Sequence, residues 1–106
     1  MAELGAPMRL RAVRNADGVV LKVLMAHPMD TGRVKDDQGM LIPAWFIKQV
    51  ELWLDQERLL SADWGPAVAA NPFLQVELAG VPPGSTLRVR WRDNRDFLRE
   101  DVLTID

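Results

Sequence analysis

The stretch MRLRAVRNADGVVLKVLMA (residues 8–26) decides the class of fold. In its first part Met8, Leu10 and Ala12 alternate with arginines, and this period of two is typical of a half-buried β-strand. The tetrapeptide NADG then supplies the residues that a tight turn needs. The second part is rich in β-branched residues and apolar on both faces apart from one lysine, which favours an interior strand. We therefore predict a β-hairpin for this stretch.

The rest of the chain repeats this organisation, because short apolar alternations are separated by turn residues and no helical period of 3.6 persists. Further strands are predicted over residues 44–55, 59–64, 72–79, 85–93 and 97–106. Together with the first hairpin they make about seven strands, which describes an all-β, immunoglobulin-like antiparallel β-sandwich. The length of 106 residues fits a single domain, residues 1–106.

The strands of residues 72–79 and 85–93 are expected to pair as a hairpin across the linker GVPPG. In that register Glu77 faces Arg88 on the solvent side, while apolar side chains face one another on the other side. Each such cross-strand pair contributes a few tenths of a kcal/mol up to about 1 kcal/mol. We expect the arginines of the second strand to form a solvated charge stripe rather than an anion site.

The four tryptophans are expected to divide between core and surface. Alternation in residues 44–55 places Lys48 on the core-facing side and Trp53 on the other side, away from the core. An outward tryptophan favours an interface, although a loop that folds over Trp53 explains the pattern equally well. We expect Trp64 and Trp91 to lie in the core, and the pattern leaves the place of Trp45 open.

Composition excludes several classes of function. The formal net charge of −2 makes no electrostatic case for nucleic-acid binding. The absence of cysteine excludes disulfides, thiolate nucleophiles and covalent carriage of a group on a thiol of this chain. No apolar run has the length of a signal-peptide core or a membrane span, so we expect neither.

The polar connection AHPMDTGRVKDDQGMLIP (residues 26–43) contains the only histidine, His27. With Asp30 nearby, His27 is a candidate general base or metal ligand. One histidine makes no zinc site, however, and the carboxylate spacings match no calcium loop. We therefore predict no catalytic residue, no metal and no cofactor. The favoured role of His27 is structural: it precedes Pro28, is held extended and hydrogen-bonds the backbone of the loop.

Four motifs carry a resemblance to a known family: HPMDTG (residues 27–32), KDDQG (residues 35–39), AANPF (residues 69–73) and VRWRDN (residues 89–94). They resemble the SoxZ family, and the resemblance runs over about residues 8–105. It implies an immunoglobulin-like domain without an active site of its own, one subunit of the SoxYZ sulfur-carrier complex of bacterial thiosulfate oxidation. Asp30 stands where the family often has glutamate, which conserves the charge.

The resemblance also implies partners and a compartment. The SoxY subunit carries sulfur intermediates on a cysteine and presents it to other Sox enzymes, which the complex contacts transiently. The family works in the periplasm, and its members are exported bound to SoxY. We expect the chain to bind a SoxY-like protein and to bind neither nucleic acid nor membrane. We also expect that the isolated chain can associate with itself.

We hypothesise that His27, Met29, Asp30 and Thr31 help to fix the cysteine-bearing arm of SoxY or dock a client enzyme, and that the face around Trp53 meets SoxY. Two alternatives stand beside the carrier-subunit interpretation. One is a stand-alone immunoglobulin-like interaction module. The other is a small hydrolase or lyase centred on His27.

Overall fold

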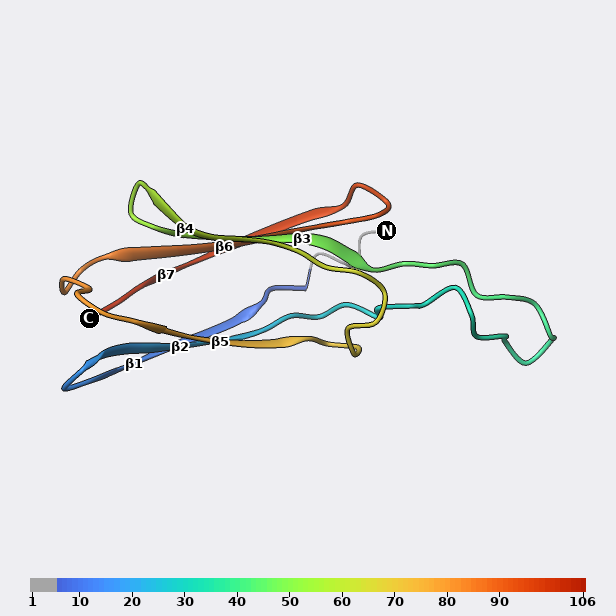
Figure 1. The fold of residues 1–106 in the computed structure, drawn as a ribbon, viewed down its shortest axis with the longest axis horizontal. Coiled ribbons are helices and arrows are strands. Elements are labelled where there is room, and N and C mark those ends of the chain that lie inside the picture. The colour runs from blue at the N-terminus through green and yellow to red at the C-terminus, as the bar shows by residue number, and fades with distance from the viewer. Residues whose placement is uncertain (1–5) are drawn as a thin grey trace.

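A computed structural model describes residues 6–106 as two antiparallel β-sheets stacked face to face (Figure 1). The strands are β1 (Arg9–Asn15), β2 (Gly18–Leu24), β3 (Ile47–Leu54), β4 (Glu57–Asp63), β5 (Phe73–Leu78), β6 (Thr86–Asp93) and β7 (Leu98–Thr104). One sheet has the order β1-β2-β5 and the other β4-β3-β6-β7. The predicted all-β sandwich of seven strands is confirmed, and the described residues contain no helix.

The fourth strand distinguishes this sandwich from the constant-type immunoglobulin domain. In that domain the fourth strand joins the sheet of the first, second and fifth strands. Here β4 pairs with β3 instead, through a hairpin in which Val50 lies opposite Ala62. The change leaves three strands in one sheet and four in the other, so the face around β3 is the broader one.

The predicted first hairpin is confirmed, since β1 and β2 pair along their whole length. Gly18 closes the turn with φ 147°, and a Cβ at this position would overlap the carbonyl oxygen of Leu78 on β5. Only glycine allows this close approach of two backbones. The second strand is interior, as predicted, because β2 lies between β1 and β5.

The predicted hairpin between residues 72–79 and 85–93 is wrong. β5 pairs with β2, so that Glu77 lies opposite Val20, whereas β6 lies between β3 and β7 in the other sheet. The connection between β5 and β6 therefore crosses from one sheet to the other. Alternation along β5 and β6 is unaffected, because either pairing places the same side chains toward the core.

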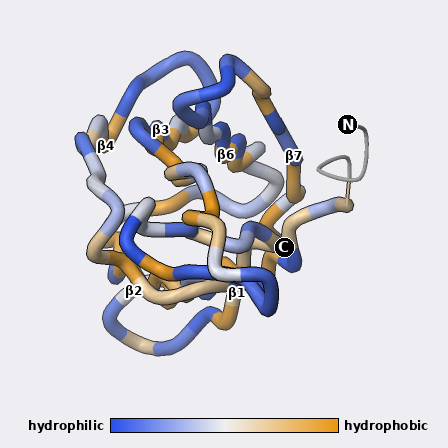
Figure 2. The backbone as a smooth tube through the Cα atoms, turned by 90° about the vertical axis from the view of Figure 1, so that its right-hand side faces the viewer, coloured by the Kyte–Doolittle hydropathy of each residue, from blue (hydrophilic) through white to orange (hydrophobic). Residues whose placement is uncertain are grey.

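The core fills the space between the two sheets. Its buried apolar members are Met8, Val19, Leu21, Val23, Met25, Met29, Ile47, Val50, Leu52, Val81, Leu87, Val89, Trp91 and Ile105. Along β6 the buried Leu87, Val89 and Trp91 alternate with arginines, as a sheet with one buried and one wet face requires. Figure 2 shows the two layers end-on, coloured by hydropathy. Trp91 is in the core as predicted, whereas Trp64 is only half-buried at its margin.

The prediction that Lys48 lies on the core-facing side is wrong, because β3 begins with a β-bulge. The pairing of β3 with β6 shifts register between Ile47 and Gln49, so one extra residue is inserted there. As a result Ile47 is fully buried and Lys48 is exposed. From Val50 onward the predicted alternation holds.

The N-terminal end of β1 is tied to β7. The N–H of Met8 donates to Oδ2 of Asp101 at 2.9 Å, and Arg99 holds both oxygens of the same carboxylate, at 2.9 Å and 2.7 Å.

Among residues 6–106 no helix is long and apolar enough to cross a membrane.

Candidate partner-binding site

His27 lies inside the sandwich, on the continuation of β2. The inward alternation of that strand runs past its end, so that Met25, His27 and Met29 are all buried. The N–H of Met29 donates to Nδ1 of His27 at 3.1 Å. Because Nδ1 accepts, the ring hydrogen lies on Nε2, which donates to Oδ2 of Asp93 at 3.1 Å. The expectation that His27 hydrogen-bonds the loop backbone is confirmed.

Asp93, at the end of β6, is a fully buried carboxylate with four donors. Its Oδ2 accepts from His27 and from Nε1 of Trp45, the latter at 2.9 Å. Its Oδ1 accepts from the backbone N–H groups of Arg95 and Phe97, each at 2.9 Å. Burial of a carboxylate is tolerated only when hydrogen bonds replace its lost hydration. Hydrogen bonds to the Asp93 carboxylate therefore connect the turn after β6 to the loop after β2.

Two indole rings enclose the histidine. The ring of His27 meets Trp45 and Trp91 edge-on, with centroids 5.4 Å and 5.2 Å apart. The guanidinium of Arg95 lies 4.0 Å above the Trp45 ring and covers it from outside. We call His27, Trp45, Trp91 and Asp93 the histidine cluster. With its side chain enclosed and both nitrogens bonded, His27 cannot reach an external substrate in this structure.

Asn71 connects the loop before β5 to the histidine cluster. Its Oδ1 accepts from the N–H of His27 at 3.1 Å, and its own N–H donates to the carbonyl oxygen of His27 at 2.8 Å. Its backbone is left-handed, with φ 51°, a conformation that asparagine tolerates better than most residues. The HPM and ANPF motifs, 44 residues apart in sequence, thus lie side by side.

The connection between β2 and β3 is itself a second hairpin. At its base, the N–H of Asp30 donates to the carbonyl of Trp45 at 2.7 Å, and the reverse bond measures 3.0 Å. Further out, residues 33–42 form what we call the arm, in which Ile42 donates to Val34 at 2.8 Å. The arm projects from the end of the sandwich (Figure 1). The sequence predicted a shaped loop here, but not its paired backbone.

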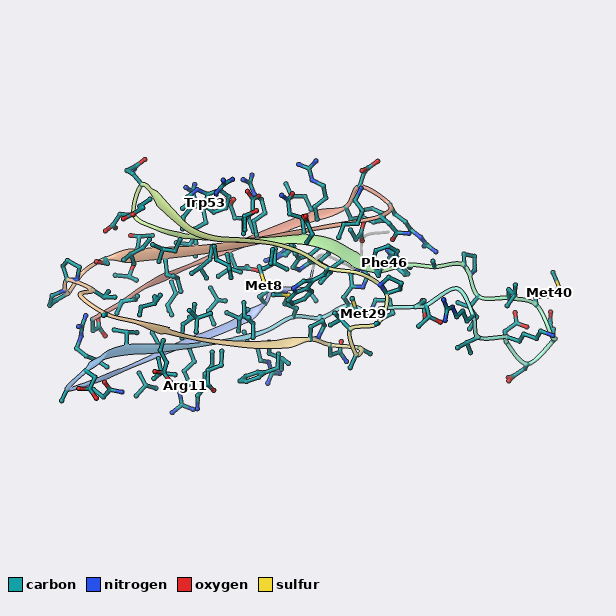
Figure 3. All side chains as sticks on the ribbon, viewed as in Figure 1. Met8, Arg11, Met29, Met40, Phe46 and Trp53 are labelled. Carbon is teal, nitrogen blue, oxygen red and sulfur yellow. The ribbon has the colours of Figure 1, made fainter. Side chains whose placement is uncertain are left out.

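The structure does not bring Trp53 together with the other proposed partner-binding residues, which lie at the base of the arm. His27 and Met29 are buried, Asp30 is half-buried, and Thr31 is exposed with its Oγ1 accepting from the N–H of Arg33 at 3.0 Å. Trp53 lies elsewhere, on the outer face of the four-stranded sheet, whereas Met29 lies between the sheets at the base of the arm (Figure 3). A partner-binding role for these residues stays a prediction.

Arginines, rather than a loop, cover Trp53. The guanidinium groups of Arg88 and Arg90 lie 5.0 Å and 4.6 Å from its ring centroid. Arg90 also reaches Glu51 at 3.4 Å and Glu100 at 3.9 Å. The stripe of arginines is thus a partly paired surface network, as expected, but its acidic partners come from β3 and β7 and not from β5.

Asp93 was missed as a site residue in the sequence, where it was only the last residue of the predicted strand of residues 85–93. The signal that could have found it is alternation, since Leu87, Val89, Trp91 and Asp93 occupy successive inward positions of β6.

Within residues 6–106 no three His, Asp or Glu side chains gather in a way that could hold a metal ion.

Comparison with known proteins identifies one family. The model of the family described as sulphur oxidation protein SoxZ matches residues 8–104 of the 106-residue chain. A comparison with individual curated proteins gives no match. The matched region includes both sheets, the histidine cluster and the arm. The chain therefore belongs to the SoxZ family and has a role in the Sox system of sulfur oxidation.

Proposed function

We propose that the chain is the cysteine-free subunit of a SoxYZ-type carrier complex, in which a SoxY-like partner bears the sulfur intermediates on its own cysteine. One observation carries the proposal: a member of a sulfur-oxidation family has no cysteine in its sequence. Covalent carriage of sulfur needs a thiolate, because the thiolate is the nucleophile in sulfur exchange. The cargo must then be attached to a second chain.

The role proposed for this subunit is to bind and present, not to catalyse. The enclosure of His27 supports this view, since the one histidine in the chain is committed to Asp93 and to the loop backbone. We place the complex in the periplasm, exported as a unit with the SoxY-like subunit, and we propose that it contacts other Sox enzymes transiently.

The surface around Trp53 is the proposed contact with the SoxY-like subunit. Trp53 is half-buried and contacted by two arginines, so its side chain has little freedom left to lose on binding. Tryptophan and arginine are the residue types most enriched at binding hot spots. Asp30 and Thr31 offer further contacts near the base of the arm, either for the cysteine-bearing segment of the SoxY-like subunit or for a client enzyme, and there His27 and Met29 act by fixing the shape of the loop.

Co-purification from the native cell tests the assignment. We expect the chain to bring down a near-stoichiometric partner whose intact mass shows a cysteine carrying sulfur adducts. Recovery of the chain alone, or with an unrelated protein, would contradict the carrier-subunit assignment and return His27 to consideration as a reactive group.

Substitution tests the residues. Trp53→Ala should weaken the affinity for the SoxY-like subunit about tenfold or more, as loss of a hot spot does, whereas Val13→Ala on β1 should leave it unchanged. Equal affinities for the two variants would refute the Trp53 contact. His27→Ala or Asp30→Ala with unaltered complex formation and unaltered thiosulfate oxidation would likewise remove these residues from the site.

A further inference from the structure

The arm is an ordered hairpin rather than a loose loop. Besides the bond from Ile42 to Val34, the N–H of Asp36 donates to the carbonyl of Met40 at 2.8 Å. The side chain of Asp36 caps the turn, because its Oδ1 accepts from the N–H groups of Gln38 and Met40 at 2.9 Å and 3.0 Å. The tip is therefore shaped before any partner arrives, which lowers the entropy lost on binding.

This ordered tip displays apolar side chains to water. Val34, Met40 and Leu41 are 56%, 65% and 58% exposed, although each is a residue type that folding normally buries. Met40 lies at the far end of the arm, at the opposite end of the molecule from Trp53 (Figure 3). Lys35 and Leu41 form a bridge pair and share one face of the arm, so Val34 and Met40 lie on the other face. Exposed apolar side chains grouped on one projection mark an interaction site more often than scattered ones do.

Two cations alternate with Val34 on the first side of the arm. Arg33 and Lys35 are exposed on either side of Val34, and neither has an ion-pair partner within residues 6–106. The carboxylate of Asp36 is engaged in the turn. A complementary groove would thus receive both faces of the arm, with apolar walls against Val34, Met40 and Leu41 and carboxylates at its rim near the two cations.

The size of the arm indicates the kind of complex. Ten residues at the tip of a hairpin cover much less than the roughly 1,200 Å² of total surface that stable interfaces bury, which is the size range of transient encounters. Unpaired cations at the rim suit such an encounter, since they raise the rate of association with an acidic surface. A short-lived partner fits these features better than a permanent subunit.

We infer that the arm docks the carrier complex on an enzyme that acts on it, with Val34, Met40 and Leu41 entering an apolar groove rimmed by carboxylates. The inference rests on the proposed function, because it assumes a carrier complex that visits enzymes. The arm and the Trp53 face then serve different partners at opposite ends of one subunit.

The test is an add-back assay. An extract of thiosulfate-oxidising cells is freed of the carrier complex, and the rate of thiosulfate oxidation is measured against the concentration of complex restored. The double variant Met40→Ser/Leu41→Ser should raise the concentration needed for half-maximal rate about tenfold or more, with the maximal rate little changed. Val13→Ser, a solvent-facing apolar residue on β1, is the matched control. Arg33→Gln/Lys35→Gln should give a smaller increase that disappears at high ionic strength.

The affinity of each variant for the SoxY-like subunit is measured alongside, and it separates the outcomes. Failure of the wild-type chain to bind that subunit refutes the proposed function itself. Normal subunit binding with an unchanged rate curve overturns the docking role of the arm. Weakened subunit binding by the Met40 and Leu41 variant overturns it also, because the arm would then contact the permanent partner. Only normal subunit binding with a shifted rate curve supports it.

Discussion

Nε2 of His27 lies 3.1 Å from Oδ2 of Asp93, and this hydrogen bond links the two sheets. His27 continues β2 of the three-stranded sheet, and Asp93 ends β6 of the four-stranded sheet. Most contacts between the layers are apolar and have no fixed direction. A buried hydrogen bond to a charged group is directional, so this pair fixes how the sheets align at the end that bears the arm.

His27→Ala should therefore act on stability. The substitution takes one donor from a buried carboxylate and opens a void between two indole rings, so we expect the free energy of unfolding to fall by about 3 kcal/mol. Urea unfolding followed by tryptophan fluorescence measures it. Asp37→Ala, in the exposed turn of the arm, is the control and should change stability by less than about 0.5 kcal/mol. An unchanged midpoint for His27→Ala would show that the pair does not stabilise the fold.

Asn71 combines two contributions that substitution can separate. Asn71→Gly keeps the left-handed backbone but removes the acceptor for the N–H of His27, at a cost of about 1 kcal/mol. Asn71→Ala removes the acceptor and also strains the backbone, which adds about 1 kcal/mol. Thermal unfolding of both variants should rank glycine above alanine in stability. The reverse order would mean that φ 51° is not maintained at this corner.

Gly18→Ala should be among the most damaging single-methyl changes in the chain. The added Cβ would overlap the carbonyl oxygen of Leu78, and φ 147° disfavours any side chain. We expect β2 and β5 to separate at this end, with a loss of about 2 kcal/mol or more. Gly65→Ala is the matched control, because a Cβ at Gly65 meets nothing within 4 Å. Equal chemical denaturation curves for the two variants would contradict the close approach.

The carboxylate of Asp101 should make stability depend on pH in the acid range. Burial raises its pKa, but hydrogen bonds from Arg99 and from the N–H of Met8 outweigh burial, and the pKa lies below its ordinary value. A lowered pKa in the folded state stabilises the protein above the unfolded pKa of about 3.9, and the contribution is lost as pH falls through the folded pKa.

Asp101→Asn should thus cost about 1–2 kcal/mol at neutral pH, and the difference from wild type should shrink below about pH 4. Unfolding measured between neutral pH and about pH 3 shows this directly. Glu100→Gln, at an exposed neighbouring position, should show little difference at any pH. A cost that stays constant down to the lowest pH would mean that the ionised form of Asp101 is not what stabilises the fold.

The fold class could be predicted because period-two alternation is a local property of each strand. The pairing of β5 could not. Its sequence offers Glu77 to the arginines of β6, but Glu51 and Glu100 satisfy the charge of Arg90 equally well from other strands. Charge matching between two strands therefore does not decide which sheet a strand joins when several neighbours carry the same charge.

The histidine cluster could be predicted only in part from the sequence, for a similar reason. His27 was a candidate site residue in the sequence, whereas its partner Asp93 was only the last residue of a predicted strand. A buried histidine beside a carboxylate 66 residues away is a long-range contact that no spacing rule contains. The arm also escaped prediction, because its two sides pair over only a few residues and the polar residues around them are typical of open loops.

The projecting arm also affects how the protein moves in solution. The radius of gyration is 15.6 Å, and the long axis of 53 Å is more than twice either of the others. A compact domain of this length has a radius of gyration of about 13 Å. An elongated particle has more friction than a sphere of equal mass, so a single chain elutes early from a gel-filtration column and resembles a larger species. Light scattering, which reports mass independently of shape, is the measurement that counts the chains.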